Sequence, residues 1–301
     1  MSWLVLLLLA DSSRAPRTFM VALTPTESLA VETAGAGEPV VLIPGLFGSA
    51  FGFRTVVPLL GDAGYRTIVV EPLGIGLSGR PEKANYSLVA QADRIAAVLD
   101  TLHVRDALLV GHSIGGSEAL RIAYRRPDLV KGLVTIEGGP TEAAATPSFK
   151  RALRFAPWIK LFGGVRLIRR KIRNLLLSSS GDSSWVTDDV VSGYTAGASR
   201  NLDATLKGYL AMAQAREPEK LAPHLFQIDC PVRLLVGTAR HDGYVPPDEV
   251  RLFERTLRSF ALDSVSGAGH FVYEEQPWAV VGAVNRLRAS VTKAVRKREA
   301  P

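Results

Sequence analysis

The chain has 301 residues, of which 47% are hydrophobic, and a formal net charge of +7. This length is sufficient for one sizeable catalytic domain with an insertion. A single cysteine, Cys230, excludes an internal disulfide, and no cluster of cysteines and histidines indicates a metal site. No recognition module for DNA or RNA accompanies the positive charge, so the charge alone does not indicate nucleic-acid binding.

The first residues include a short apolar segment. Trp3–Ala10 is apolar, but it is too short to span a bilayer and lacks the basic stretch that opens a secretory signal peptide. We therefore treat residues 1–18 as an extension that precedes the fold. A cytoplasmic location is favoured, and export or peripheral membrane attachment stays open because of this segment.

The first strand that bears on function is predicted at Val40–Ile43, a short apolar run. The loop after it, Pro44–Ser49, contains two glycines, which give the backbone the freedom to turn an N–H group inward. Phe47 in this loop and Phe51 just beyond it are the aromatic residues that we expect to contact an apolar part of a substrate.

A glycine-rich motif follows the strand predicted at Thr67–Val70. Residues 74–79 read GIGLSG, which matches the dinucleotide-binding pattern GxGxxG. That function requires a helix that opens directly from the turn, whereas a polar stretch with Pro81 comes next and the helix begins only near Ser87. The motif is therefore interpreted as a loop at the mouth of a site, and no cofactor is expected.

The most informative segment is Gly111–Gly115, which reads GHSIG. It lies between an apolar run, Ala107–Val110, and a helical pattern, Ser117–Ala123. A serine at the apex of a strand–turn–helix unit is typical of a nucleophile elbow, in which the flanking glycines avoid collisions with the neighbouring strand and helix. Ser113 is therefore the candidate nucleophile. It requires a base and an acid, because a serine hydroxyl is unreactive at neutral pH.

The candidate acid and base follow two later strands. Asp242 lies in the loop after the strand predicted at Val232–Gly237, and His270 lies in a glycine-rich loop after a short strand. Functional groups gather at the carboxyl ends of strands in an open parallel sheet, where a carboxylate can hold the imidazole in the tautomer that acts as a base. Each residue alone has a structural explanation, but their order and placement together favour a Ser113–His270–Asp242 triad.

The remaining parts of the site can be assigned from the same loops. The backbone N–H of Ile114, directly after the nucleophile, is one expected donor of an oxyanion hole. Leu46 in the loop after the early strand is the expected second donor, with Phe47 as the alternative. His112 is interpreted as a packing residue of the elbow, and His241 as a solvated residue of the acid loop.

A long segment separates the strand predicted at Gly132–Glu137 from the next strand. We assign residues 141–222 to a helical insertion, and residues 19–140 with 223–301 to the catalytic domain. Lys150–Arg173 contains nine lysine and arginine residues and no acidic residue, and a helix there has one apolar and one basic face. We favour a solvated basic face over docking on anionic membrane, which such an amphipathic surface leaves open.

These motifs resemble those of the α/β-hydrolase superfamily, in its small esterase and hydrolase branch. The resemblance runs from about Leu29 to Leu287 and implies an α/β fold with a mostly parallel central sheet flanked by helices and an inserted helical cap. It rests on IPGLFGS (43–49), EPLGIGLS (71–78), GHSIGG (111–116), DGYVP (242–246), GHF (269–271) and EQP (275–277).

The chain departs from the common pattern of that superfamily at three points. Relatives commonly have histidine at position 44 and aspartate at position 71, where this chain has Pro44 and Glu71, and the loop that leads to Asp242 is longer than usual. Epoxide hydrolases and haloalkane dehalogenases of similar architecture have aspartate at the position of Ser113. The serine therefore disfavours those two activities.

Together, the resemblance and the triad imply a serine hydrolase that cleaves a carboxylic ester through an acyl-enzyme, without a cofactor or metal. A C–C bond hydrolase and an acyltransferase or perhydrolase would use the same three residues and stay alternatives. A non-catalytic binding protein on this fold is disfavoured because all three triad candidates are present. The expected partner is a small apolar ester rather than nucleic acid, and the oligomeric state is left open.

Overall fold

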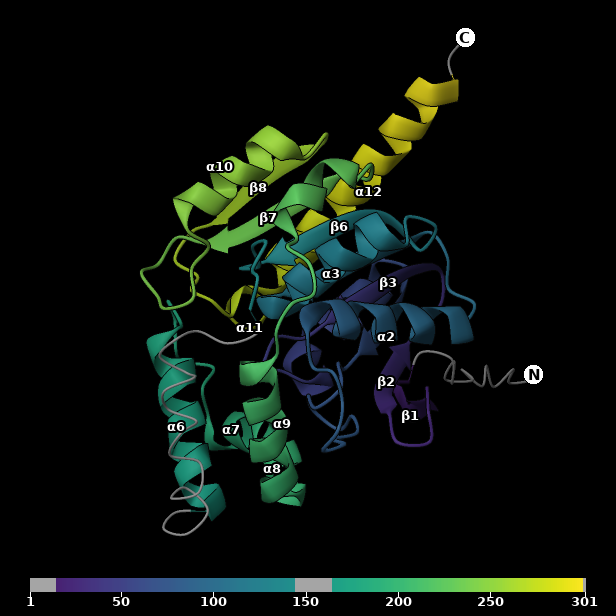
Figure 1. The fold of residues 1–301 in the computed structure, drawn as a ribbon. Helices are drawn as coiled ribbons and strands as arrows, with labels where there is room; N and C mark the ends of the chain where they lie inside the picture. The colour runs from purple at the N-terminus through teal and green to yellow at the C-terminus, as the bar shows by residue number, and fades with distance from the viewer. Residues whose placement is uncertain (1–14, 144–163, 300–301) are drawn as a thin grey trace, which may run out of the picture.

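An eight-stranded, mostly parallel sheet organises the protein (Figure 1). The computed structural model describes residues 15–143 and 164–299. The strand order is β1-β2-β4-β3-β5-β6-β7-β8, in which β2 pairs antiparallel with β1 and β4 and all other pairs are parallel. The strands are β1 (Arg17–Ala22), β2 (Ser28–Ala34), β3 (Glu38–Ile43), β4 (Tyr65–Val70), β5 (Ala107–His112), β6 (Val130–Ile136), β7 (Val232–Gly237) and β8 (Phe260–Val265).

The central strands are apolar throughout because helices cover both faces of the sheet. Every residue of β5 is buried, which is typical of a strand inside a parallel sheet. Its side chains alternate between two cores, with Leu109 on one side and Leu108 and Val110 on the other. The edge strand β1, by contrast, buries only Val21.

Helices form a layer on each face. The first face is covered by α2 (Leu88–Thr101), α3 (Ile114–Arg125) and α10 (Pro247–Thr256), and the second by α1 (Val56–Asp62) and α12 (Pro277–Glu299). Figure 1 shows α2 and α3 side by side in front of the sheet. Both layers place their apolar side chains against the strands, which confirms the predicted α/β-hydrolase architecture.

The register aligns the carboxyl ends of neighbouring strands at one edge. Ile43 of β3 lies opposite Gly111 of β5, and His112 lies opposite Ile136 of β6. The residues that follow these strands, including Ser113 and Glu137, therefore emerge beside one another. In an open sheet of parallel strands this edge is where ligands bind.

The described part of the chain between β6 and β7 is mostly helical. Figure 1 shows its helices grouped together apart from the sheet layers. They are α6 (Gly164–Ser178), α7 (Asp188–Tyr194), α8 (Ala196–Arg200) and α9 (Leu202–Gln214), followed by the short 3-10 helix η2 (Ala222–Gln227). Two further short helices, η1 (Ala50–Phe53) and α11 (Val272–Glu275), follow β3 and β8. The predicted division of the chain into a catalytic domain and a cap stays a prediction.

Parts of two sequence predictions lie outside the described residues. These are the apolar segment Trp3–Ala10 and residues 150–163 of the basic run. Within the described ranges, no helix is long and apolar enough to cross a bilayer.

The helix expected after the GIGLSG motif begins where the sequence placed it. It is α2, which starts at Leu88 and is capped by Ser87, whose hydroxyl accepts a hydrogen bond from the Ala90 N–H at 3.2 Å. Because eight residues separate this start from Gly79, no helix N-terminus opens from the glycine motif, as the dinucleotide-binding pattern would require.

We expect Leu133→Ala to lower the free energy of unfolding by about 2–5 kcal/mol, because Leu133 of β6 is fully buried in the first core and its removal leaves a cavity. The matched control is Leu262→Ala on the edge strand β8, where the side chain is exposed and a change within about 0.5 kcal/mol is expected. Urea denaturation followed by circular dichroism measures both values. Equal losses for the two variants would contradict the assignment of β6 to the centre of the sheet.

Candidate active site

Ser113 lies at a strained turn between β5 and α3. Its backbone has φ +54° and ψ −121°, a conformation that residues other than glycine rarely adopt. Such a conformation costs on the order of 1–3 kcal/mol and persists only where the surrounding structure enforces it. The serine is half-buried, directly ahead of the α3 N-terminus, where backbone N–H groups lack partners within the helix. The structure therefore places Ser113 where a nucleophile elbow requires it.

The glycines of the elbow are required because backbones meet there. A Cβ on Gly115 would lie 2.5 Å from the Ile43 carbonyl oxygen at the end of β3, and a Cβ on Gly111 would collide with the backbone of Gly115. Gly138, after β6, is similarly confined, since its Cβ would lie 2.8 Å from the Ser113 carbonyl oxygen. The nucleophile turn is thus packed against the segments that follow β3 and β6.

The loop after β3 contacts the nucleophile directly. A Cβ on Gly45 would lie 3.1 Å from the Ser113 Cβ, and the loop is closed by the Gly48 N–H, which donates to the Gly45 carbonyl at 2.9 Å. Leu46 and Ile114, the predicted oxyanion donors, are both half-buried on the two segments that meet here. Their role as donors stays a prediction.

Glu71 fixes the far end of this loop and accounts for the glycine motif. Its buried carboxylate accepts hydrogen bonds from the backbone N–H groups of Ala50 at 2.8 Å and Leu77 at 2.5 Å. A Cβ on Gly76 would overlap the same carboxylate, so the glycine leaves room for Glu71. The motif that matches a dinucleotide pattern serves here to join two loops.

His270 is held beside the elbow by its backbone. Its N–H donates to the Ser179 carbonyl at 2.7 Å, and its carbonyl oxygen lies 3.1 Å from Nε2 of His112. The rings of His112 and His270 meet edge to face with centroids 4.7 Å apart. Because a carbonyl only accepts hydrogen bonds, His112 carries its proton on Nε2. This contact agrees with the interpretation of His112 as a packing residue.

The surroundings of His270 favour its neutral form. Burial, with the adjacent His241 as a second cause, lowers the pKa of His270 to about 4, and the Gly243 backbone partly opposes this shift. Burial also holds the pKa of His112 well below its usual value. At neutral pH the His270 imidazole therefore has a free lone pair, as a general base requires.

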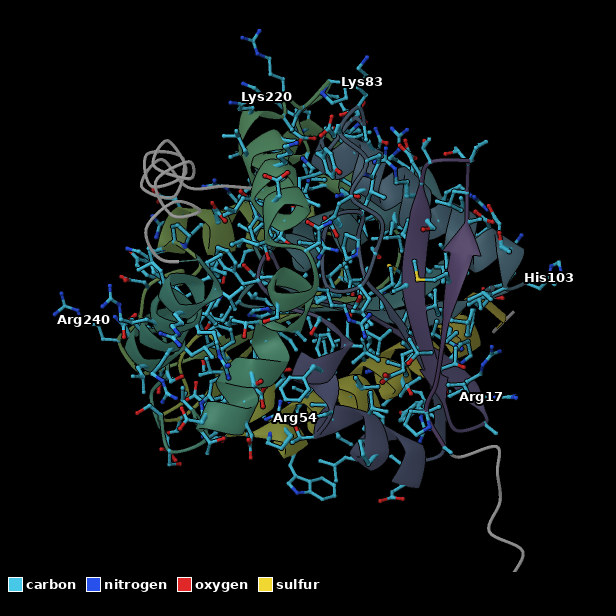
Figure 2. The ribbon with its side chains drawn as sticks, turned by 90° about the horizontal axis from the view of Figure 1, so that it is seen from below. Arg17, Arg54, Lys83, His103, Lys220 and Arg240 are labelled. Atoms are coloured by element: carbon cyan, nitrogen blue, oxygen red, sulfur yellow. The ribbon has the colours of Figure 1, made fainter. Side chains whose placement is uncertain are left out.

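The structure does not bring Asp242 into contact with His270. The Asp242 side chain is exposed, and no hydrogen bond or ion pair of its carboxylate is found among the described residues. The neighbouring Gly243 does approach the imidazole, since its Cβ would lie 3.1 Å from Nδ1 of His270. The loop also points outward at Arg240, which Figure 2 shows extending into solvent.

The prediction that His241 is a solvated residue is wrong. His241 is 7% exposed, and its Nδ1 lies 2.7 Å from the Ala239 carbonyl oxygen. The turn of the loop at Ala239 directs this side chain inward and the next one, Asp242, outward. As a result, the loop presents an imidazole to the site where a carboxylate was expected.

A carboxylate that the sequence analysis did not assign lies at the site. Glu137 directly follows β6, is buried, and accepts a hydrogen bond from the Gly237 N–H at 2.6 Å through Oε1. Its Oε2 lies 3.4 Å from Nε2 of His241. Burial raises the pKa of Glu137, while the Gly237 N–H and His241 oppose that rise. A charged residue at the carboxyl end of a central parallel strand, followed by two glycines, is the signal that could have identified it.

Glu137, His241 and His270 also have the composition of a cation site. One nitrogen of each ring and one carboxylate oxygen lie within 4.8 Å of one another. No metal site is expected from the sequence, and proton chemistry fits this group of residues better than cation binding does. A cation on Nδ1 of His270 would leave the proton on Nε2, and the imidazole could then not remove a proton from Ser113.

One carboxylate connects the loop of His270 to the helical insertion. Glu275 accepts a hydrogen bond from the Gly269 N–H at 2.9 Å through Oε1, and from the N–H groups of Gly181 and Asp182 at 2.9 and 2.8 Å through Oε2. Together with the hydrogen bond from His270 to Ser179, these contacts attach the base to the segment after α6.

A cavity of about 430 Å³ lies between the insertion and the loop after β3. Phe51 contributes to its wall, and Phe47 packs edge to face on Tyr209, another wall residue, with ring centroids 5.3 Å apart. Ser113 and His270 do not line this cavity. Phe51 is thus on the wall of this cavity and Phe47 packs against another wall residue, and their contact with a substrate stays a prediction.

We expect Gly115→Ala to lower the free energy of unfolding by at least about 2 kcal/mol, because the new Cβ meets the Ile43 carbonyl at 2.5 Å with backbone on both sides. Gly61→Ala in α1 is the control, since no atom lies within 4 Å of its Cβ position. Since alanine is the better helix former, Gly61→Ala should raise the free energy of unfolding by about 0.5–1 kcal/mol. Thermal and urea denaturation test both, and a neutral Gly115→Ala would contradict the close packing of the elbow.

Comparison with known proteins agrees with this architecture. The chain is 25% identical over 260 residues to the mouse (Mus musculus) sn-1-specific diacylglycerol lipase ABHD11. This alignment covers 83% of this chain and 80% of that protein. It is 27% identical over 262 residues to a 2-hydroxy-6-oxononadienedioate/2-hydroxy-6-oxononatrienedioate hydrolase of Comamonas testosteroni. That alignment covers 84% of this chain and 87% of the relative. Among solved structures, the epoxide hydrolase CorEH superposes with a TM-score of 0.77 at 21% identity, over 92% of this chain and all of that one.

The relatives in sequence are hydrolases, whereas the likeness to CorEH concerns the fold alone. The family model described as alpha/beta hydrolase fold matches residues 38–277, a range that begins with β3 and includes Ser113, Glu137 and His270. The chain therefore belongs to the alpha/beta hydrolase fold family.

Proposed function

We propose that the protein hydrolyses a carboxylic ester through an acyl-enzyme formed on Ser113. The observation that carries the proposal is the strained Ser113 turn, with an imidazole that burial keeps neutral, His270, held beside it through His112. A serine requires such a base to become a nucleophile. An elbow of this kind has no evident use in a protein that only binds ligands, because its strain would then serve no chemistry.

The proposed reaction has two half-reactions. His270 takes the proton from the Ser113 hydroxyl as Oγ attacks the ester carbonyl, and the backbone N–H groups of Leu46 and Ile114 stabilise the oxyanion. The imidazolium then gives its proton to the leaving alcohol. In the second half-reaction His270 removes a proton from water, the hydroxide attacks the acyl-enzyme, and the proton returns to Ser113 as the carboxylic acid leaves.

An uncharged substrate is proposed from the cavity beside the site. Of the three arginines on its wall in the described part of the chain, Arg200 is exposed, Arg54 pairs with Glu274 at 2.6 Å, and Arg80 donates to the Gly76 carbonyl at 2.5 Å. The guanidinium groups of Arg54 and Arg80 are thereby held by the protein, and aromatic and aliphatic residues such as Phe51 make up much of the remaining wall. The relative ABHD11 carries the name of a diacylglycerol lipase, which supports an apolar ester.

C–C bond hydrolysis is the second candidate. The relative from Comamonas testosteroni carries the name of a hydrolase of 2-hydroxy-6-oxo acids, and such a reaction could use the same serine and histidine. Those substrates are dicarboxylates, which require cationic side chains free to bind carboxylates. The paired state of Arg54 and Arg80 favours the ester over this alternative.

The helical insertion gives limited support for a contact with anionic membrane. Arg166, Arg169 and Arg170 of α6 are exposed, whereas Ile172 and Leu176 are buried in the second core. Since the apolar face is covered by protein, the proposed contact would be electrostatic and sensitive to salt. A solvated basic face is favoured for the same reason.

Labelling with a fluorophosphonate probe tests the activated serine. We expect the wild type to be labelled at neutral pH and Ser113→Ala to give no signal, because only an activated hydroxyl attacks the phosphorus. Ser117→Ala is the matched control: this hydroxyl lies one turn further along α3 and donates to the Thr141 carbonyl. A folded wild type without labelling would refute the proposed function.

A substrate panel then separates the two candidate reactions. We expect p-nitrophenyl esters of uncharged acids to be hydrolysed with a kcat/KM at least about 100-fold above that for 2-hydroxy-6-oxo dicarboxylates, a difference of about 2.7 kcal/mol. The measurement is the initial rate for each substrate at equal enzyme concentration. Preference for the diketo acids would instead assign the site to C–C bond cleavage.

The pH dependence of kcat/KM tests the state of His270. A base acts only when neutral, so activity should persist above its pKa and fall tenfold per pH unit below it. With a pKa of about 4, we expect kcat/KM to be flat down to about pH 5. Circular dichroism at each pH separates loss of activity from unfolding. An acidic limb near 6.5, the value of an ordinary histidine, would contradict the effect of burial.

A further inference from the structure

We propose that Glu137, and not Asp242, is the carboxylate that accepts the hydrogen bond from Nδ1 of His270 in the working enzyme, with His241 as its second partner. The inference rests on the proposed role of His270 as the base. It assigns Glu137 as a positioning residue, since a carboxylate there fixes the tautomer that leaves Nε2 free for the Ser113 proton.

The backbone holds Glu137 in place for this task. Its φ of +46° is a left-handed conformation that a glutamate rarely adopts, and the residue after it, Gly138, packs against the Ser113 carbonyl. Oε1 is fixed by the Gly237 N–H at 2.6 Å. With one oxygen anchored to the neighbouring strand β7 and the side chain 1% exposed, the position of the other oxygen is determined.

Three buried atoms at this point lack hydrogen-bond partners in the structure. They are Oε2 of Glu137, Nε2 of His241 and Nδ1 of His270. A buried polar group without a partner costs about 1–3 kcal/mol, so three of them within one small cluster indicate that they serve one another. One ligand atom from each of these residues lies within 4.8 Å of the others, which places the imidazole of His270 beside the carboxylate of Glu137.

The tautomer of His241 defines what it does to Glu137. Nδ1 of His241 must donate, because its partner is the Ala239 carbonyl oxygen at 2.7 Å. Nε2 then faces Oε2 of Glu137 at 3.4 Å, and two lone pairs would repel unless a proton lies between them. The second lone pair of Oε2 stays available for the N–H of His270.

Asp242 is poorly placed for the same role. Its carboxylate is exposed, and none of the described residues pairs with it; an exposed charge interacts weakly because water screens it. The groups that do face His270 come from other elements: His112 from β5, Glu137 from β6, and His241 and Gly243 from the loop after β7. Glu275, which follows His270 at the end of α11, is occupied by three backbone N–H groups.

Kinetics of Glu137→Gln and Asp242→Asn in the full-length protein compare the two carboxylates. Both changes keep the shape of the side chain and remove its charge. We expect Glu137→Gln to lower kcat by about 10²–10⁴-fold with KM changed less than about threefold, as loss of the orienting carboxylate does in serine hydrolases. The loss of kcat in Glu137→Gln should exceed the loss in Asp242→Asn at least tenfold. Glu137→Asp, which keeps a carboxylate, should recover part of the kcat that Glu137→Gln loses. The reverse order of the two losses would overturn the proposal.

A spectroscopic signature separates positioning from a merely structural role. The Nδ1 proton of His270, identified as the downfield imidazole resonance that His270→Gln removes, should persist in Asp242→Asn and disappear in Glu137→Gln. Its disappearance in Asp242→Asn overturns the proposal even if Glu137→Gln does not fold. Fluorophosphonate labelling of the wild type separates failure of the proposed function from failure of the Glu137 assignment. If the wild type is not labelled, the proposed function fails. If it is labelled but Asp242→Asn loses more kcat than Glu137→Gln, only the assignment of Glu137 is refuted.

Discussion

Close backbone contact at the end of β5 is the constraint on which the rest of the site depends. The turn at Ser113 brings the start of α3 so near to the end of β3 that only glycine fits at positions 111 and 115. This contact fixes the direction of α3, the strained backbone of the serine and the position of the loop after β3. A bulkier elbow would separate the nucleophile from the backbone donors that an oxyanion needs.

Glutamate carboxylates organise the loops around this turn by accepting hydrogen bonds from backbone N–H groups. Glu71 joins the loop after β3 to the glycine motif, and Glu275 joins the loop of His270 to the insertion. Glu137 likewise anchors to the end of β7. Charge-assisted hydrogen bonds of this kind contribute about 1.5–3 kcal/mol each, which offsets part of the cost of burying a carboxylate. The loops are therefore positioned by side chains beneath them.

The fold could be predicted from sequence because its signals are local. Apolar runs gave the central strands to within about two residues, and the elbow was identified from its glycines. The direction in which each side chain of a loop points could not be predicted in this way. The orientations of His241 and Asp242 depend on how the loop after β7 turns at Ala239, and the importance of Glu137 depends on a pairing with a residue 104 positions away. No periodicity in the sequence encodes such contacts.

The attachment of His270 to the helical insertion has a mechanical consequence. The base has no rigid strand beneath it: its loop is held on one side by the elbow through His112 and on the other by the segment after α6, through Ser179 and Glu275. A substrate that displaces the insertion in order to enter must pull on the imidazole as well. Such a displacement would stretch the hydrogen bonds that Ser179 and Glu275 make around the loop of His270, and so would couple the position of the insertion to that of the base.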